Sequence, residues 1–185
     1  MTIRKATQHD SPFLATFILM AMGDIVYRFI GGEDQEQAQK FMEHFTSGTN
    51  NQYSYENCWV AETDGEIIAA ACVYDGARLQ VLREPVIRFL KDHFGNEVTM
   101  EDETEPGEYY IDSLGVRADQ QGRGTGTRML QFLIEEFVSG KHETLGLLVD
   151  EDNPGAERLY LKLGFVDIGR KIFGGKQMKH LQIKP

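Results

Sequence analysis

Residues 114–127 of the chain read LGVRADQQGRGTGT, the most informative stretch of the sequence. An apolar strand runs through a polar turn into a helix, whose start is crowded by Gly122, Gly124 and Gly126. Glycine lets the backbone approach a ligand closely, and the free N–H groups and positive dipole end of a helix attract anions. The stretch therefore predicts a phosphate-binding turn, anchored by an apolar helix face at Met129, Leu130, Leu133, Ile134 and Phe137.

Two other phosphate-binding motifs do not fit this turn. The dinucleotide fingerprint requires glycine or alanine at its sixth position, which here is Thr127 or Met129, depending on the starting glycine. A P-loop requires Gly-Lys followed by serine or threonine, and neither Gly-Lys pair, at 140–141 and 175–176, meets this requirement. Binding of a nucleoside triphosphate is therefore disfavoured. The alternative to phosphate binding is that the glycines only allow the helix to pack tightly on the sheet.

A second informative segment is residues 149–165, VDEDNPGAERLYLKLGF. Asn153 suits a helix N-cap, Pro154 the first turn and Gly164 the helix end. Tyr160 shares one helix face with three apolar residues, so by itself it is typical of a core tyrosine.

The two segments together resemble the GCN5-related N-acetyltransferase superfamily. Its pattern is Gln/Arg-x-x-Gly-x-Gly/Ala, then Asn, then a Tyr before Gly-Phe, and residues 121–126, Asn153, Tyr160 and 164–165 match it in order. The resemblance is sharp over residues 109–173, while the N-terminal half agrees only in its order of elements. It implies an α/β (α+β) fold with a mixed, mostly antiparallel sheet of about seven strands, flanked by about four to five helices. The implied reaction transfers an acetyl group from acetyl-CoA to a primary amine.

The resemblance also implies the cofactor-binding residues. Backbone groups of Leu114, Gly115 and Val116 would bind the pantetheine arm of acetyl-CoA. The pyrophosphate would lie on N–H groups of the turn, which comprises Gln121, Gly122, Arg123, Gly124, Thr125, Gly126 and Thr127, and Asn153 belongs to the same site. Arg123 and Arg128 would reach the outer phosphates, with a plain surface position as the alternative.

Acyl transfer to an amine requires a base for the ammonium, whose pKa is near 10, and an acid for the leaving thiolate. Tyr160 matches the family's general acid. Asp112 is the candidate base, because alternation along the strand of residues 109–116 places Tyr110 and Asp112 on the side of Leu114. An ordinary carboxylate is a weak base, so burial or a relaying water is required. The alternative is that Asp112 orders the substrate or pairs with a cation.

Periodicity and turn signals predict one domain, residues 1–185, with an inserted helical excursion at about 75–107. This excursion could cover the predicted active site. The first helix begins at Ser11-Pro12 and carries an apolar stripe of Phe13, Phe17 and Met20. The second begins near Asp34. The remaining predicted elements are strands at 3–6, 57–62, 66–74, 109–116, 144–149, 165–173 and 176–183, and helices at 85–94, 122–139 and 154–163.

The two cysteines flank a hairpin whose turn is Asp64-Gly65. With Thr63 opposite Glu66, counting places Cys58 opposite Ala71, so that Cys72 points to the other face. A disulfide is then geometrically disfavoured, and both cysteines are expected to be free.

Residues 101–108 carry five carboxylates, at 101, 102, 103, 105 and 108. Such a run usually forms a solvated loop. The functional alternative is a negative rim that attracts a protonated amine.

The composition is that of a globular protein, with 41% hydrophobic and 26% charged residues. The net charge of −10 argues against nucleic acid as a partner and is more compatible with a cationic substrate. No apolar run reaches the length of a membrane helix and no leader pattern is evident, so a cytoplasmic location is expected. No cluster with metal-ligand spacing is found, so no metal is expected.

The favoured prediction is an N-acetyltransferase that acts on a small-molecule amine. One alternative is acetylation of a protein or peptide, which requires an open groove. The other is a non-catalytic acyl-CoA sensor, against which Tyr160 and Asp112 argue. A homodimer is an expectation from the resemblance; Phe173, Met178 and Leu181 either form such a contact or complete the core.

Overall fold

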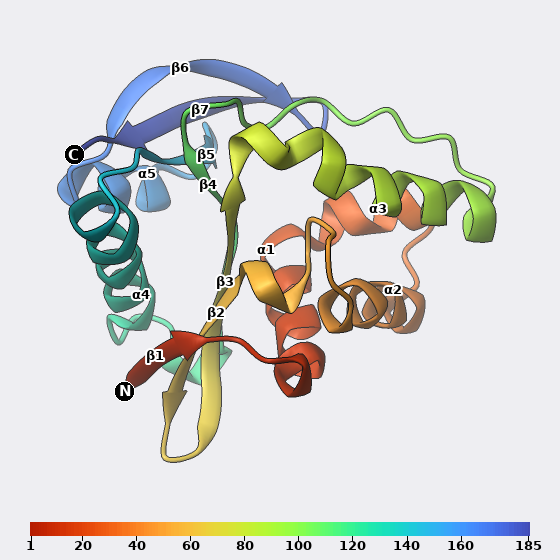
Figure 1. Cartoon of the computed structure of the whole chain (residues 1–185), viewed down its shortest axis with the longest axis horizontal. Coiled ribbons are helices and arrows are strands. Elements are labelled where there is room, and N and C mark those ends of the chain that lie inside the picture. Colours follow the sequence, from red (N-terminus) through yellow and green to blue (C-terminus); the bar gives the residue numbers. More distant parts are fainter.

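The computed structural model describes all residues, 1–185, and contains one seven-stranded sheet (Figure 1). The strand order is β1 (Thr2–Lys5), β2 (Cys58–Thr63), β3 (Glu66–Asp75), β4 (Tyr109–Val116), β5 (Leu145–Asp150), β7 (Lys176–Ile183) and β6 (Val166–Phe173). Only β4 and β5 run parallel, and all other neighbours are antiparallel. The predicted mixed, mostly antiparallel sheet is confirmed.

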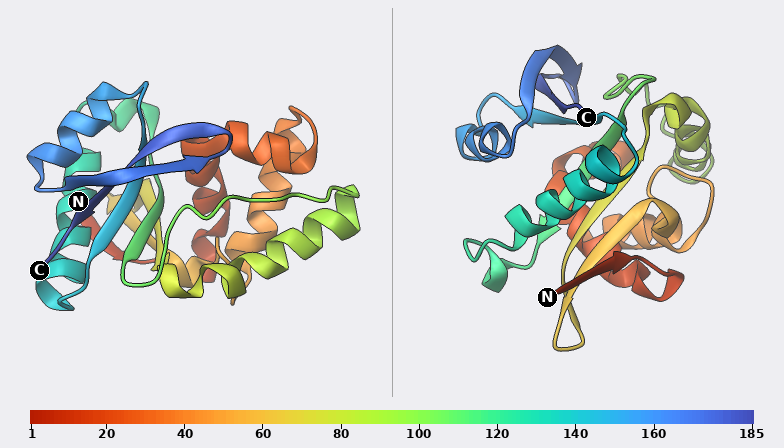
Figure 2. Two further views of the ribbon diagram at one scale, coloured as in Figure 1. Left: turned by 90° about the horizontal axis from the view of Figure 1, so that it is seen from above. Right: turned by 60° about the vertical axis from the view of Figure 1, so that its left-hand side comes forward.

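Helices cover both faces of this sheet, as the views in Figures 1 and 2 show. One face carries α1 (Ser11–Ile30), α2 (Gln35–Ser47) and α3 (Leu79–Phe94), and their apolar residues form the larger core. The other face carries α4 (Thr125–Leu133), which continues in a π-helical turn to Gly140, and α5 (Pro154–Lys162). The sheet therefore separates two apolar cores.

Local capping explains several element boundaries. Asp34 Oδ1 accepts a hydrogen bond of 2.9 Å from the Gln37 N–H, which starts α2 where the sequence predicts. Strand β4 has the predicted bounds. Helix α3 begins at Leu79, six residues earlier than predicted, and continues through Pro85.

Helix α1 differs from its predicted amphipathic pattern. Phe13 and Met20 are 50% and 48% exposed, and the face that packs on the sheet instead includes Leu14, Phe17 and Ile18. Residues Gln8–Ile30 are long and apolar enough to cross a membrane by length and composition, contrary to the sequence-based expectation. Much of this segment is buried against α2, β3 and β4, and this burial accounts for its apolar character.

The two cysteines lie directly opposite one another, because a β-bulge between β2 and β3 shifts the register. Glu62 pairs with Ile67 and Ala61 with Ala69, so Ile68 is the extra residue and Cys58 pairs with Cys72. The predicted pairing of Cys58 with Ala71 is therefore wrong. Both thiols are nevertheless free and buried, as expected.

A buried polar cluster forms around Glu108, the residue before β4. Its carboxylate accepts hydrogen bonds from Thr104 Oγ1 at 2.6 Å and Gln182 Nε2 at 2.8 Å, and His180 Nε2 lies 2.9 Å away. Residue 146 of β5 must be glycine, because a Cβ there would collide with this carboxylate. Burial tends to raise the pKa of Glu108, but these hydrogen bonds outweigh it and hold the pKa below its usual value. The cluster connects the acidic segment to β4, β5 and β7.

Glu108→Gln is expected to lower the free energy of unfolding at pH 7 by about 1–3 kcal/mol, because it leaves buried donors without a charged acceptor. The depressed pKa adds stability above the unfolded-state pKa of about 4.3, and this contribution is lost as the pH falls through the folded-state pKa. Urea unfolding at several pH values measures both effects. The control is Glu105→Gln, an exposed glutamate of the same segment, with a small expected change. Equal effects of the two substitutions would contradict the assignment.

Candidate active site

The two parallel strands of the sheet separate at its centre. Strands β4 and β5 pair only from Tyr109–Leu145 to Ile111–Leu147, and beyond these pairs they diverge. A cavity of about 860 Å³ lies in this region, bordered by β4, β5, α1, α5 and the β6–β7 hairpin. Its wall includes two predicted catalytic residues, Asp112 and Tyr160, and two predicted cofactor-binding residues, Leu114 and Asn153.

The backbone of β4 offers unpaired groups to the gap. The Arg117 N–H donates to the Ile68 carbonyl, so by antiparallel alternation Gly115 and Ala70 form the next hydrogen-bonded pair. The N–H and C=O groups of Leu114 and Val116 then point away from β3, toward the gap. One of them, the Val116 carbonyl, accepts a hydrogen bond of 3.0 Å from Gln121 Nε2. The geometry suits binding of an amide-containing chain along β4.

Gly115 has a different structural role from its neighbours. A Cβ at this position would collide with the carbonyl of Phe17, so glycine is what lets α1 pack directly on β4. Residue 115 therefore lies on the side of β4 that faces α1, while the side chains of Leu114 and Val116 face α4.

The glycine turn leads into α4, as predicted, although the helix begins at Thr125 rather than Gly122. Gly122 and Gly124 have φ of +71° and +83°, a conformation that favours glycine, and no atom occupies the space where their side chains would lie. The Arg128 N–H donates to the Gly124 carbonyl, which leaves the N–H groups of residues 125–127 without acceptors in the helix. These groups suit a pyrophosphate.

The position of the turn relative to β4 fits the pantetheine arm and the pyrophosphate of one ligand. The position of a Gly126 Cβ would lie 3.6 Å from Val116 and 3.7 Å from Leu114, so the helix start lies over the diverging part of β4. Arg123 and Arg128 are exposed and form no ion pair within the chain, unlike Arg117, which pairs with Glu66 and Asp119. Two cations are thus available near the turn.

Helix α5 places two predicted residues at the cavity. Asn153 Oδ1 accepts a hydrogen bond of 3.1 Å from the Ala156 N–H, so Asn153 is the helix cap, as the sequence indicates. Tyr160 packs edge-on against Phe165, with ring centres 6.0 Å apart. Burial raises the pKa of Tyr160, and its hydroxyl makes no hydrogen bond within the protein. The hydroxyl is therefore protonated and available to a ligand.

Asp112 occupies a second β-bulge. Val73 pairs with Ile111 and Cys72 with Ser113, so Asp112 is the extra residue on β4. A bulge interrupts side-chain alternation. Tyr110 and Asp112 consequently face the core of α1 to α3, whereas Leu114 packs on the core of α4. The prediction that Asp112 shares the face of Leu114 is wrong, although both residues reach the cavity.

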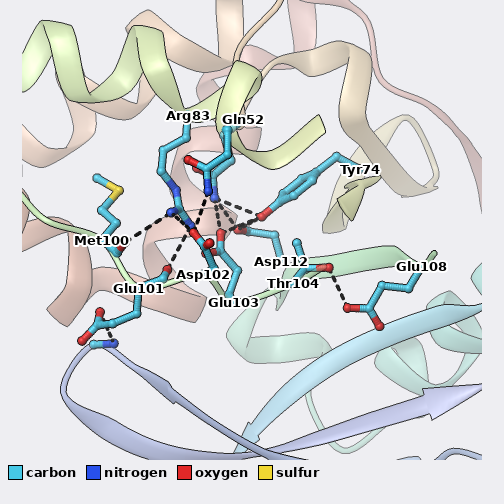
Figure 3. A network of polar contacts seen from close by, with 12 residues as sticks. Gln52, Tyr74, Arg83, Met100, Glu101, Asp102, Glu103, Thr104, Glu108 and Asp112 are labelled. Carbon is cyan, nitrogen blue, oxygen red and sulfur yellow. Dashed lines mark hydrogen bonds and ion pairs between the residues drawn. The ribbon is translucent and has the colours of Figure 1, made fainter. Parts of the chain in front are cut away.

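The surroundings of Asp112 make its carboxylate a stronger base than usual. Oδ1 accepts hydrogen bonds from Gln52 Nε2 at 3.1 Å and Tyr74 OH at 3.3 Å, while the buried Oδ2 has no partner in the protein (Figure 3). Burial raises the pKa of Asp112 to about 7, and the charge of Glu103 adds to this rise. The burial that a base at this position requires is therefore present.

The acidic segment is only partly a solvated loop. Glu103 and Glu108 are fully buried, while Glu101, Asp102 and Glu105 are exposed. Glu103 forms an ion pair with Arg83, a residue of α3 that is also buried. The interpretation of the whole run as solvated is wrong, because a distant arginine compensates the charge inside the core.

Four residues near Asp112 were not predicted as site residues: Gln52, Tyr74, Arg83 and Glu103. One sequence signal was available, since Arg83 lies within the apolar stripe of Leu79, Leu82, Val86 and Leu90. A cation on the buried face of a helix requires a buried anion.

A helix start with free N–H groups beside two diverging strands is the arrangement that the sequence resemblance implies for binding acetyl-CoA. Comparison with known proteins agrees. The chain matches the acetyltransferase (GNAT) family over residues 26–165. The chain therefore belongs to the GNAT acetyltransferase family and is an acetyl-CoA-dependent transferase, as the sequence resemblance implies.

Solved structures are similar over the whole chain. One acetyltransferase has 30% identity and a TM-score of 0.83, with 100% of this chain and 99% of that chain covered. An N-acetyltransferase from Staphylococcus aureus Mu50 has 21% identity and a TM-score of 0.82, with 99% and 100% covered. The aminoglycoside acetyltransferase AAC(6')-Ib in complex with coenzyme A has 20% identity and a TM-score of 0.62, with 99% and 94% covered. A search of the curated proteins found no match.

Proposed function

We propose that this enzyme transfers the acetyl group of acetyl-CoA to a small-molecule primary amine, with Asp112 as the base and Tyr160 as the acid. The observation that carries the proposal is that both residues line one cavity, with an unpartnered Asp112 oxygen and a Tyr160 hydroxyl that makes no hydrogen bond within the protein. Acetyl-CoA supplies an activated acyl carbon, and side chains of the protein accept and donate the protons.

Asp112 would act first. Its Oδ2 is unpartnered but buried, so Asp112 would receive the proton of the acceptor ammonium through a relaying water. A carboxylate with a pKa of about 7 is ionised at slightly alkaline pH, as this step requires. Loss of this proton frees the nitrogen lone pair to form the C–N bond.

Tyr160 would act on the other side of the bond that breaks. As the C–S bond cleaves, the sulfur takes the electron pair, and the Tyr160 hydroxyl supplies a proton to give the free thiol. The proton taken by Asp112 is later released to solvent, and the tyrosinate recovers the second proton that the nitrogen loses as the amide forms, so the products are an N-acetyl amine, coenzyme A and one proton.

The half of the cavity away from the glycine turn would hold the acceptor. Helix α1 is interrupted at Met22, where φ is −140°, and this region lines the cavity. Six apolar side chains line this half beside the charged side chains of Asp24, Arg28 and Lys176: Leu19, Met20, Met22, Ile25, Phe173 and Met178. Phe173 and Met178 are therefore cavity residues, whereas Leu181 completes the core. The six apolar side chains favour an amine with an apolar body.

The tip of the β6–β7 hairpin is held over this half of the cavity. Arg28 Nη1 donates to the Gly174 carbonyl at 2.6 Å, and the Gly174 N–H donates to Glu101 at 3.3 Å. Lys171 pairs with Glu105 at 3.2 Å. These contacts hold the hairpin tip beside one end of the site, which favours a small acceptor over a peptide that needs an open groove.

We expect alkyl- or arylalkylamines to be acetylated with a kcat/KM at least about tenfold above that of a lysine-containing peptide. The test measures thiol release from acetyl-CoA with a panel of phenethylamine, a straight-chain amine, spermidine, an aminoglycoside and the peptide. Faster turnover of the peptide would assign the enzyme to protein acetylation. Binding of acetyl-CoA without transfer to any amine would favour the sensor alternative.

A further inference from the structure

The carboxyl groups of Glu103 and Asp112 share the same two donors (Figure 3). Tyr74 OH lies 2.7 Å from Glu103 Oε1 and 3.3 Å from Asp112 Oδ1. Gln52 Nε2 lies 2.8 Å from Glu103 Oε1 and 3.1 Å from Asp112 Oδ1. The tyrosine has one proton to donate and cannot satisfy both acids. The two carboxyl groups are therefore close and compete for the same protons.

The buried tyrosines and the buried cysteine around Asp112 carry no charge at neutral pH. Burial raises the pKa of Tyr53, Tyr74 and Tyr110 well above the usual value, and the pKa of Cys72 is also raised, by contact with Cys58 and by burial. On the cavity side, the charged groups are Asp24 and Arg28 of α1 and Lys176 of β7, all exposed, together with Asp150 and Asp152. Glu103 and Arg83 are thus the charged groups buried beside Asp112.

Arg83 is directed at Glu103 rather than at Asp112. Its Nη2 donates to Glu103 Oε2, and its other contacts are with Asp102 and with the carbonyls of Met100 and Glu101. Burial raises the pKa of Glu103, and the guanidinium opposes this rise by favouring the ionised form of Glu103. A proton shared between the two acids then resides mainly on Asp112, the acid that faces the cavity.

We propose that Glu103 is a positioning residue for the transfer reaction: anchored on Arg83 and joined to Asp112 through Tyr74 and Gln52, it holds Asp112 in place and determines whether Asp112 carries a proton. The catalytic consequence rests on the base role proposed above for Asp112. A like charge nearby makes Asp112 hold its proton more strongly. Asp112 thereby becomes a base matched to neutral pH rather than an ordinary carboxylate.

The test is a ¹³C NMR titration of the side-chain carboxyl groups in the full-length protein, with the pH dependence of kcat/KM measured in parallel. Glu103→Gln keeps the shape but removes the charge, so the midpoint of the Asp112 titration should fall by about one pH unit. Tyr74→Phe removes a shared donor to the ionised acids, so the midpoint of the pair should rise. Glu97→Gln, an exposed glutamate that follows α3, is the matched control and should leave the midpoint unchanged.

Opposite shifts in the two variants support the proposal, because a merely structural role would lower stability without moving the titration in two directions. Unchanged midpoints in both variants would overturn it. If Glu103→Gln fails to fold, the milder Tyr74→Phe variant decides, and an unchanged or lower midpoint refutes the proposal. The NMR midpoints can also move while the pH at which kcat/KM falls on the acidic side stays the same. In that case Glu103 controls the protonation of Asp112, but Asp112 is not the base of the reaction.

Discussion

Asp112→Asn is expected to lower kcat/KM for the acceptor amine by about 10²–10⁴-fold, the usual contribution of a general base. The amide has nearly the same shape as the carboxyl group but cannot accept the ammonium proton. Affinity for acetyl-CoA should change little, because the backbone of Leu114 and Val116 and the glycine turn are untouched. Steady-state thiol release and calorimetric titration with acetyl-CoA measure the two quantities, and Asp92→Asn, on the exposed side of α3, is the control.

The pH dependence of the wild-type enzyme provides a second reading of the same residue. Asp112 must be ionised to act as a base, so kcat/KM should fall below a pH of about 7, the pKa that burial gives this carboxyl group. This fall in kcat/KM at acidic pH should be absent in Asp112→Asn. A variant with raised KM, unchanged kcat and the same fall at acidic pH would instead assign Asp112 to substrate ordering.

Tyr160→Phe is expected to lower kcat by about 10²–10³-fold, with little change in the affinity for acetyl-CoA. The substitution keeps the ring that packs on Phe165 but removes the proton for the leaving sulfur. Tyr109→Phe is a matched control at the start of β4, where the ring packs on Phe137 outside the cavity. If the two variants have equal turnover, Tyr160 is only a core residue.

The positions of strands and helices could be predicted to a large extent from the sequence. Strand β4 has the predicted bounds, and Asp34 and Asn153 cap their helices as expected, because these signals are local. It was less predictable which face of the sheet each strand side chain points to. The extra residues Ile68 and Asp112 each break the alternation, and no sequence signal marked either bulge.

Long-range polar contacts were the other limit of prediction. The burial of Glu103 depends on Arg83, twenty residues away, and that of Glu108 depends on His180, seventy-two residues away. Composition alone indicates a solvated loop, because it contains no information on distant partners. Tyr160 and the glycine turn were accessible because their spacing follows a known pattern, whereas Gln52 and Tyr74 belong to no such pattern.

The bulge at Asp112 has a consequence for how this enzyme can change over time. Because of this bulge, Asp112 reaches the cavity from the side of the α1 to α3 core and Leu114 reaches it from the side of the α4 core. With the roles proposed above, substitutions around Asp112 would alter the amine that is accepted without touching the groups that bind coenzyme A. Selection for a new substrate can therefore act on one half of the reaction while the other half is inherited unchanged.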